Sequence, residues 1–186
     1  MKPKRTNWCV VTGGPSSGKT TTIGGLRGRG YRTTNEHARH YIDTQRVTGR
    51  SVEDIRANQH EFQKRVIDMQ REQEASLDPS ALVFLDRAMP DGLAYYRFLG
   101  LDPDPDYLSA LTHTLYAEVF LLDLLPLASD YARTEDRAAQ IAIHSELGAV
   151  YRELGYDPIA VPALPPEARV DFILAALPNP THGVLP

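Results

Sequence analysis

A short apolar run meets a glycine-rich loop, and then a lysine and three threonines, in the segment WCVVTGGPSSGKTTT at residues 8–22. The run WCVV is continuous and rich in β-branched side chains, which predicts a buried strand. From Gly18 onward the pattern suits a helix, and the glycines of RGRGY at 27–31 end it. A buried strand that leads through glycines into a helix is typical of α/β domains with a parallel sheet.

The loop between this strand and this helix, GGPSSGKT, fits the pattern G-x-x-x-x-G-K-[ST]. Its glycines let consecutive backbone N–H groups point at a phosphate, and the helix directs the positive end of its dipole at the same anion. In this pattern the lysine contacts the β- and γ-phosphates and the following hydroxyl binds Mg²⁺. A chance match is the alternative, but the strand before the loop and the helix after it argue against one. We therefore predict a site for ATP with Mg²⁺, formed by Gly13, Gly14, Pro15, Ser16, Ser17, Gly18, Lys19, Thr20 and Thr21.

The rest of the chain alternates between predicted strands and predicted helices. Further strands are expected at 31–36, 81–86, 118–123 and 157–162. Helical patterns cover 37–47, 52–75 with Ser51 as its cap, 91–99, 104–116, 136–154 and 165–177. Strands without polar alternation, separated by helices, indicate a parallel sheet covered on both faces. We therefore predict a three-layer α/β fold with a five-stranded parallel sheet.

Length and cysteine usage suggest one domain in a reducing compartment. The 186 residues suit a single domain at 1–178, followed by a loosely ordered tail at 179–186. The single cysteine, Cys9, lies in the first apolar run as a small buried hydrophobe and forms no internal disulfide. The start shows no signal-peptide pattern, and the longest later apolar stretch is broken by Asp123 and Pro126. We expect a cytoplasmic protein.

A second group of candidate residues follows the strand ALVFLD. Parallel strands bring their carboxyl ends to the ligand crevice, so Asp86 can hold Mg²⁺ opposite Thr20. The alternative is an aspartate that caps the next turn. A motor ATPase needs a glutamate in the next position to polarise water, but this chain has Arg87, which accepts no proton. An arginine there suits an anionic acceptor held bidentately, with Asp91 orienting Arg87 or contacting the acceptor, and so favours phosphoryl transfer over hydrolysis.

Three more charged residues complete the candidate site. Glu36, at the end of the second strand, can take the proton of an acceptor hydroxyl or share in metal binding; otherwise it is a solvated residue at a helix start. Arg133 and Arg137, in the segment ARTEDRAAQ, share one helical face and suit a lid that closes over phosphates. The alternative for this pair is an exposed, salt-bridged helix start. His37 and His40 are assigned to the surface or to packing.

Together these segments give a chain that resembles the bacterial family of small ATP-binding AAA-domain proteins. The resemblance covers about residues 8 to 176 and rests on the phosphate loop, the E-x-x-R after the second strand and the DR…D…Y after the third. It implies kinship with the kinase domain of bifunctional nicotinamide-nucleotide enzymes and, more distantly, with nucleoside and nucleotide kinases. It also implies the sheet order 2-3-1-4-5, binding of Mg·ATP, and a phosphotransferase-like site. In that site Asp86 and Arg87 are the metal and acceptor pair, Glu36 is the candidate base, and Arg133 and Arg137 belong to the lid.

Two departures from the kinase pattern leave the acceptor open. The fourth strand ends in LLDLLPL, without the polar signature of a nucleotide kinase, and no residues stand out as readers of a particular base. We predict a kinase that transfers the γ-phosphate of ATP to a small acceptor, a nucleoside, a nucleotide or a similar metabolite.

The alternative function is an NTPase switch or regulatory module that acts on a protein partner. Arg87 in place of a glutamate argues against it, and no N-K-x-D segment is present to read guanine. The net charge of −4 and the lack of an extended basic run argue against binding to nucleic acid or membranes. We expect a monomer or a homodimer, with the helix at 52–75 in the core or at a dimer interface.

Overall fold

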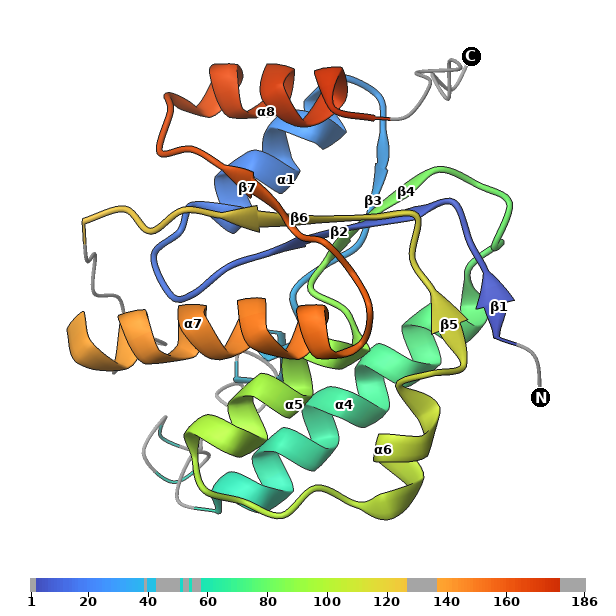
Figure 1. Ribbon diagram of the computed structural model, residues 1–186, viewed down its shortest axis with the longest axis vertical. Helices are drawn as coiled ribbons and strands as arrows, with labels where there is room; N and C mark the ends of the chain where they lie inside the picture. Colours follow the sequence, from blue (N-terminus) through green and yellow to red (C-terminus); the bar gives the residue numbers. More distant parts are fainter. Residues whose placement is uncertain are drawn as a thin grey trace.

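The computed structural model describes the chain over residues 3–38, 40–42, 51, 54, 58–126 and 137–177 (Figure 1). Its central sheet has five parallel strands: β2 Trp8–Thr12, β3 Arg32–Thr33, β4 Val83–Asp86, β6 Glu118–Leu122 and β7 Ile159–Val161. They pair in the order β3-β4-β2-β6-β7, which is 2-3-1-4-5 when these five strands are counted along the chain. The order reverses beside β2, so the carboxyl end of β2 opens where sheets of this class bind ligands.

Helices cover both faces of this sheet, as Figure 1 shows. On one face α1 Lys19–Gly28 packs against α8 Pro166–Ala175. On the other face α5 Met89–Phe98 packs against α4 Gln59–Ser76 and against α7 Arg137–Glu153. The short helix α6 Pro105–Ala110 lies beside α5, where Tyr107 contacts Tyr96 at 6.0 Å between ring centroids. The fold is therefore the predicted three-layer α/β arrangement.

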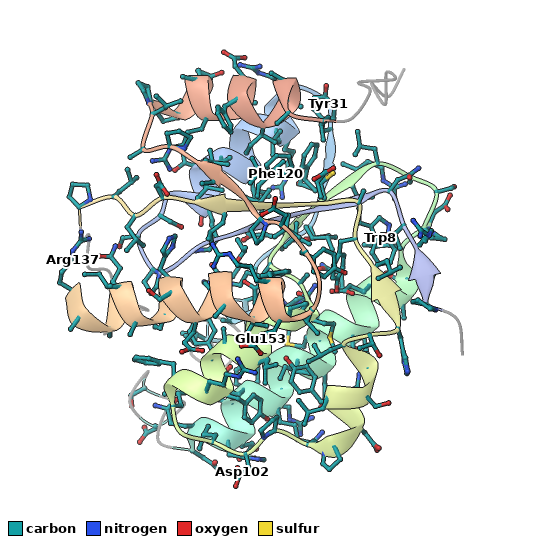
Figure 2. The ribbon with its side chains drawn as sticks, in the orientation of Figure 1. Trp8, Tyr31, Asp102, Phe120, Arg137 and Glu153 are labelled. Carbon is teal, nitrogen blue, oxygen red and sulfur yellow. The ribbon has the colours of Figure 1, made fainter. Side chains whose placement is uncertain are left out.

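The alternation of side chains along β2 divides the core into two parts. Cys9 and Val11 join the cluster under α1 and α8, whereas Trp8 and Val10 face the side of α7. Figure 2 shows the same division, with Phe120 on the α8 side of the sheet and Trp8 on the α7 side. Cys9 is buried, as predicted, and burial together with the nearby carboxylate of Glu118 raises the pKa of its thiol to about 12.

The structure differs from the sequence-based expectations at three elements. β3 is shorter than predicted and holds only Arg32–Thr33. The helix expected at 104–116 ends at Ala110, because β5 Thr114–Leu115 pairs with β1 Lys4–Arg5 in a separate two-stranded sheet. The third element is the helix expected at 52–75, whose observed counterpart α4 begins seven residues later, at Gln59.

The backbone N–H of Asp54 does donate to the hydroxyl of Ser51 at 3.1 Å, as the predicted cap requires. However, α4 begins at Gln59 with its own cap, because the side chain of Asn58 accepts from the backbone N–H of Glu61 at 3.1 Å. Parts of the predicted elements fall outside the described residues, namely 39, 43–47, 52–53, 55–57, 136 and the tail at 179–186. Within the described ranges, no helix combines the length and the apolar character needed to cross a membrane.

Candidate active site

The phosphate loop between β2 and α1 needs glycine at two positions. Gly13 has a φ of 150° and Gly18 a φ of 82°, and both values are rare for residues with a side chain. A Cβ on Gly13 would lie 2.8 Å from the carbonyl oxygen of Leu122. A Cβ on Gly18 would lie 2.7 Å from a guanidinium nitrogen of Arg169. Conformation and space therefore both explain why the motif has glycine at these two places.

Lys19 lies inside the loop that it follows. Its side chain is buried, and Nζ donates to the carbonyl oxygens of Gly13 at 2.7 Å and Gly14 at 3.0 Å and to the hydroxyl of Ser17 at 3.3 Å. Burial lowers the pKa of Lys19 to about 7, and the positive charge of Arg87 acts in the same direction. The ammonium group is thus held where a phosphate wrapped by the loop would meet it.

Two polar side chains that the sequence analysis missed support the loop from behind. Gln140 on α7 donates to the carbonyl oxygens of Pro15 at 2.8 Å and Leu125 at 3.2 Å. Arg169 on α8 donates to the carbonyl oxygen of Ser17 at 2.6 Å. Both side chains are almost fully buried, on helix faces whose other buried residues are apolar or aromatic. A polar residue on the apolar face of an amphipathic helix is the signal that could have identified them.

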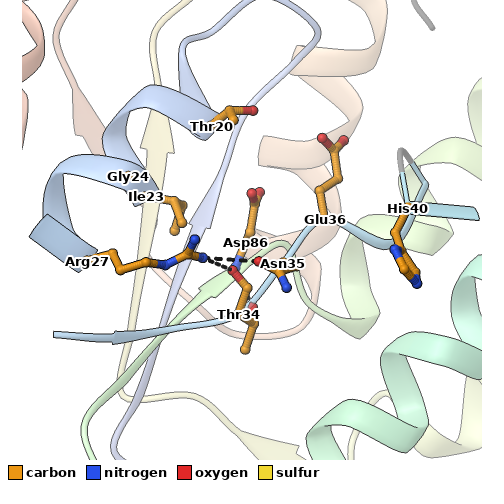
Figure 3. A pocket seen from close by; sticks show the side chains of 9 residues that line it. All are labelled: Thr20, Ile23, Gly24, Arg27, Thr34, Asn35, Glu36, His40 and Asp86. Atoms are coloured by element: carbon orange, nitrogen blue, oxygen red, sulfur yellow. Dashed lines mark hydrogen bonds between the residues drawn. The ribbon is translucent and has the colours of Figure 1, made fainter. Parts of the chain in front are cut away.

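A pocket of about 250 Å³ opens next to the loop, at the carboxyl ends of β3 and β4 (Figure 3). Three of the residues singled out from the sequence line it together, and Figure 3 shows the carboxylates of Glu36 and Asp86 extending toward the level at which the Thr20 side chain lies. The helix α1 and the segment after β3 supply most of the other walls. The full set of lining residues is Thr20, Ile23, Gly24, Arg27, Thr34, Asn35, Glu36, His40 and Asp86.

Asp86 brings a buried carboxylate to this pocket. Its backbone N–H donates to the hydroxyl of Thr34 at 2.8 Å, which ties the end of β4 to the end of β3. The side-chain oxygen Oδ1 is buried and has no hydrogen-bond partner among the residues that the structure describes. Burial, and next the negative charge of Glu36, raise the pKa of this carboxyl to about 7, although Lys19 and Arg87 oppose the shift.

These residues fit a magnesium ion that is bound together with phosphates. The Asp86 oxygen, which has no partner within the described ranges, and the Thr20 hydroxyl both lie on the wall of one pocket, and both are oxygen ligands of the kind that Mg²⁺ prefers. In the part of the chain that the structure describes, no group of three or more His, Cys, Asp or Glu side chains could hold a metal alone. Mg²⁺ commonly takes one or two protein ligands and completes its shell with water and phosphate oxygens, so this donor set is sufficient.

The guanidinium of Arg87 is held by three side chains. Its Nε donates to Glu36 at 3.1 Å, Nη1 to Asp91 at 3.3 Å and Nη2 to the hydroxyl of Tyr95 at 3.1 Å. The guanidinium also lies over the ring of Tyr95, 5.2 Å from its centroid. The arginine predicted to hold an acceptor is therefore placed against two protein carboxylates, and one of them, Glu36, lines the pocket.

Of the two predicted lid arginines, Arg133 lies outside the described residues. Arg137 is the first residue of α7, at the end of the helix next to the phosphate loop. Its Nη1 donates to the carbonyl oxygen of Leu125 at 3.3 Å and to the side chain of Gln140. Arg137 thus contacts the same Gln140 that supports Pro15, whereas its role in a lid stays a prediction.

Comparisons with known proteins agree with this fold. Residues 8–169 match the model of a protein family described as AAA domain. No curated protein matches the chain. Among solved structures, the NadR protein in complex with NR superimposes with a TM-score of 0.68 at 16% identity, over 94% of this chain and 51% of that one. The chain thus spans about half the length of that NadR chain.

A second solved structure matches over nearly its whole length. Deoxyadenosine kinase from M. mycoides, with its products dCMP and a flexible dCDP bound, gives a TM-score of 0.62 at 13% identity. The match covers 90% of this chain and 96% of that one. At these identities the likeness shows that the chain shares the fold of these two proteins.

Proposed function

This chain belongs to the AAA-domain family that residues 8–169 match, and we propose that it is a kinase that transfers the γ-phosphate of ATP to a hydroxyl group of a small metabolite. The acceptor we propose is a nucleoside, a nucleotide or a similar compound. One observation carries the proposal: Thr20, Glu36 and Asp86 line a single pocket beside the phosphate loop. That pocket offers oxygen ligands for a metal and a carboxylate for a hydroxyl proton in one place.

The phosphate loop and Lys19 form the ATP half of the proposed site. Backbone N–H groups at the start of α1 and the Lys19 ammonium neutralise the charge of the phosphates. Thr20 and Asp86 are the residues that would hold Mg²⁺, which when bound neutralises charge on the phosphate oxygens. Gln140 and Arg169 keep the loop in shape by donating to its carbonyl oxygens. A preformed loop of this kind lowers the cost of ordering when the nucleotide binds.

Glu36 and Arg87 form the acceptor half. The Glu36 carboxylate accepts the proton of the acceptor hydroxyl as that oxygen attacks the γ-phosphorus, and the bond from the γ-phosphorus to the bridging oxygen breaks to release ADP. Arg87 holds Glu36 through the 3.1 Å hydrogen bond from Nε, and so fixes the carboxylate on the pocket wall. Arg133 and Arg137 are proposed to neutralise charge from the side of the lid.

The deciding experiment is ADP formation from Mg·ATP with and without a panel of acceptors. The panel contains nucleosides including deoxyadenosine and nicotinamide riboside, nucleoside monophosphates, sugars and amino alcohols. Lys19→Ala serves as the blank. Stimulation by one subset, with a mass gain of one phosphate on a member of it, is the expected result. Slow turnover that is indifferent to every acceptor would overturn the kinase proposal and favour a nucleotide switch.

A further inference from the structure

We propose that Asp91 is a positioning residue of this site: it fixes the guanidinium of Arg87 against Glu36, at a set place relative to the phosphate loop. The inference deepens the proposed kinase function and rests on it for its catalytic meaning. Asp91 is not among the residues that line the pocket, so it acts through Arg87.

Asp91 is a buried carboxylate that accepts hydrogen bonds from β2, from α7 and from the turn between β4 and α5. It is 3% exposed. Its Oδ1 accepts from the hydroxyl of Thr12 at 2.6 Å and from Nη1 of Arg87 at 3.3 Å. Its Oδ2 accepts from the hydroxyl of Tyr151 at 2.6 Å and from the backbone N–H of Ala88 at 3.1 Å. Thr12 ends β2 immediately before the phosphate loop, Tyr151 lies on α7, and Asp91 itself lies in the first turn of α5.

The position of Arg87 needs such support, because its backbone is in an unfavourable conformation. Its φ of 71° lies in the left-handed region, which a residue with a long side chain seldom adopts. The backbone is held by a bond from its N–H to the carbonyl oxygen of Val11 at 3.2 Å and by one from Gln70 to its carbonyl oxygen at 3.3 Å. Strained residues of this kind concentrate at functional sites. Here the strain turns an arginine side chain toward Glu36 and Asp91.

The chemistry of the four contacts requires a carboxylate rather than an amide at position 91. An ionised carboxylate only accepts hydrogen bonds, and each of its oxygens faces two donors. In Asp91→Asn the new NH₂ would face either Nη1 of Arg87 or the N–H of Ala88, and neither of these can accept. The hydroxyls of Thr12 and Tyr151 can rotate to accept, but the arginine and the backbone cannot. Whichever way it is placed, the amide NH₂ therefore opposes one donor that cannot accept, either Arg87 or the backbone of Ala88.

Asp91 affects the pocket through the side chain of Arg87, which contacts both Asp91 and Glu36. Asp91 and Glu36 hold different nitrogens of the same guanidinium, Nη1 and Nε respectively. With Asp91 in place, the guanidinium keeps one orientation, and so does the Glu36 carboxylate that it contacts. Without it, Arg87 keeps Glu36 and Tyr95 as partners but loses its link to Thr12 and the phosphate loop. We therefore expect the loss of Asp91 to affect the chemical step more than the binding of ATP.

The first test measures the orientation of Arg87 directly and needs no substrate. Hydrogen exchange at Nε–H of Arg87 is followed by NMR in ¹⁵N-labelled protein, with the signal assigned by its absence in Arg87→Ala. In Asp91→Asn we expect exchange of this proton to be at least about 10-fold faster than in the wild type, because the hydrogen bonds of the Arg87 guanidinium open more often. The matched control is Tyr151→Phe, which removes one donor to Asp91 and leaves the Arg87 contact, so its Arg87 signal should be unchanged. A folded Asp91→Asn variant with wild-type exchange at Arg87 would overturn the proposal.

Thr12→Val provides the second variant if Asp91→Asn does not fold. It removes the hydroxyl that shares Oδ1 with Arg87 and keeps the volume of the side chain nearly constant. The expected result is faster exchange at Arg87 than in Tyr151→Phe. Equal exchange in these two variants would overturn the proposal.

The second test uses activity and a double-mutant cycle. The acceptor is deoxyadenosine or nicotinamide riboside, whichever the wild type phosphorylates. Asp91→Asn should lower kcat at least about 10-fold while the KM for ATP stays within about 3-fold, and Arg87→Ala/Asp91→Asn should be no slower than Arg87→Ala. If the losses in kcat of the two single variants multiply in the double variant, Asp91 has a role that is independent of Arg87, and the inference is overturned. If the wild type phosphorylates neither compound nor any other of the panel, the proposed kinase function fails, and the exchange measurement still decides whether Asp91 positions Arg87.

Discussion

The side chains of Arg87 and Glu36 meet across 3.1 Å although 51 residues separate them in the sequence. Glu36 follows β3 and Arg87 follows β4, and these neighbouring strands are parallel, so their carboxyl ends lie at one edge of the sheet. Both side chains are largely buried, with 17% of Glu36 and 12% of Arg87 exposed. A carboxylate held by an arginine on the wall of a pocket has the fixed orientation that a general base requires.

Glu36→Gln tests this assignment with little change in shape. The amide oxygen of glutamine can still accept from Nε of Arg87, but the amide cannot take a proton from a hydroxyl. We expect kcat with the identified acceptor to fall about 10²- to 10⁴-fold, which is the usual contribution of a general base. The affinity for Mg·ATP, followed with a fluorescent analogue, should change little. A variant with wild-type kcat would move the role of base to another group, with Asp86 as the first candidate.

Lys19→Ala should separate ATP turnover from folding. Removal of Nζ takes a donor from the carbonyl oxygens of Gly13 and Gly14, but it also removes a buried cation whose pKa burial lowers to about 7. These effects on the free energy of unfolding oppose each other, so the urea midpoint should change little. ADP formation should fall at least about 10²-fold, because a preorganised charge on the phosphates is lost.

The control for Lys19→Ala is a lysine far more exposed to solvent. Lys64 on α4 pairs with Asp68 at 3.0 Å, with 56% of its side chain exposed. Lys64→Ala should leave ADP formation unchanged, since an exposed pair of this kind contributes little. Full activity in Lys19→Ala would contradict the assignment of the phosphate loop.

The parts of the site that follow from local sequence were predictable. The strand, loop and helix around Gly13 and Lys19 are contiguous, and each signal lies within a few residues of the next. The sheet order agrees with the one that the resemblance implied. Glu36 and Asp86 were placed at one edge because both end predicted strands, and the structure brings both to the same pocket.

The parts that depend on contacts between distant elements were not predictable. Gln140 and Arg169 reach loop carbonyls from 125 and 152 residues away, and although their place on an apolar helix face marks them as buried, nothing in the sequence names the partners that they contact. The pairing of β1 with β5 rests on two residues in each strand, too few to show a pattern. The positive φ of Arg87 was also missed, because tertiary hydrogen bonds hold it against the local preference of the residue.

The packing of α1 on α8 offers a pair of matched substitutions in one helix. A Cβ on Gly25 would lie 2.7 Å from a methyl group of Val170, whereas a Cβ on Gly28 would meet no atom within 4 Å. Gly25→Ala should therefore lower the free energy of unfolding by about 1–3 kcal/mol. Gly28→Ala should leave it unchanged or raise it by up to about 1 kcal/mol, since alanine favours helix more than glycine does. Urea unfolding of both variants measures the difference.

Gly25→Ala and Gly28→Ala also test whether the packing of α8 affects the phosphate loop. Arg169 precedes Val170 on α8 and donates to the carbonyl oxygen of Ser17 in the phosphate loop. A shift of α8 that relieves the contact with Gly25→Ala should also disturb this bond, so the affinity for ATP should fall in that variant and not in Gly28→Ala. Equal ATP affinities in the two variants would show that the loop keeps its shape without α8.

Asp86→Asn should stabilise the free protein in a way that depends on pH. Burial raises the pKa of Asp86 from 3.8 to about 7 in the folded state, so between these values the folded protein binds more protons than the unfolded chain. Stability from this group therefore falls as the pH rises through that window, and its full cost is present above about pH 7. Asparagine does not ionise, so the gain in Tm over the wild type should be small near pH 4 and reach several degrees near pH 8. If the gain in Tm is equal at the two pH values, desolvation of the charged carboxylate is not its cause. If the gain grows with pH and the variant binds Mg·ATP more weakly, the buried carboxylate lowers the stability of the free protein and is retained because it binds the ligand.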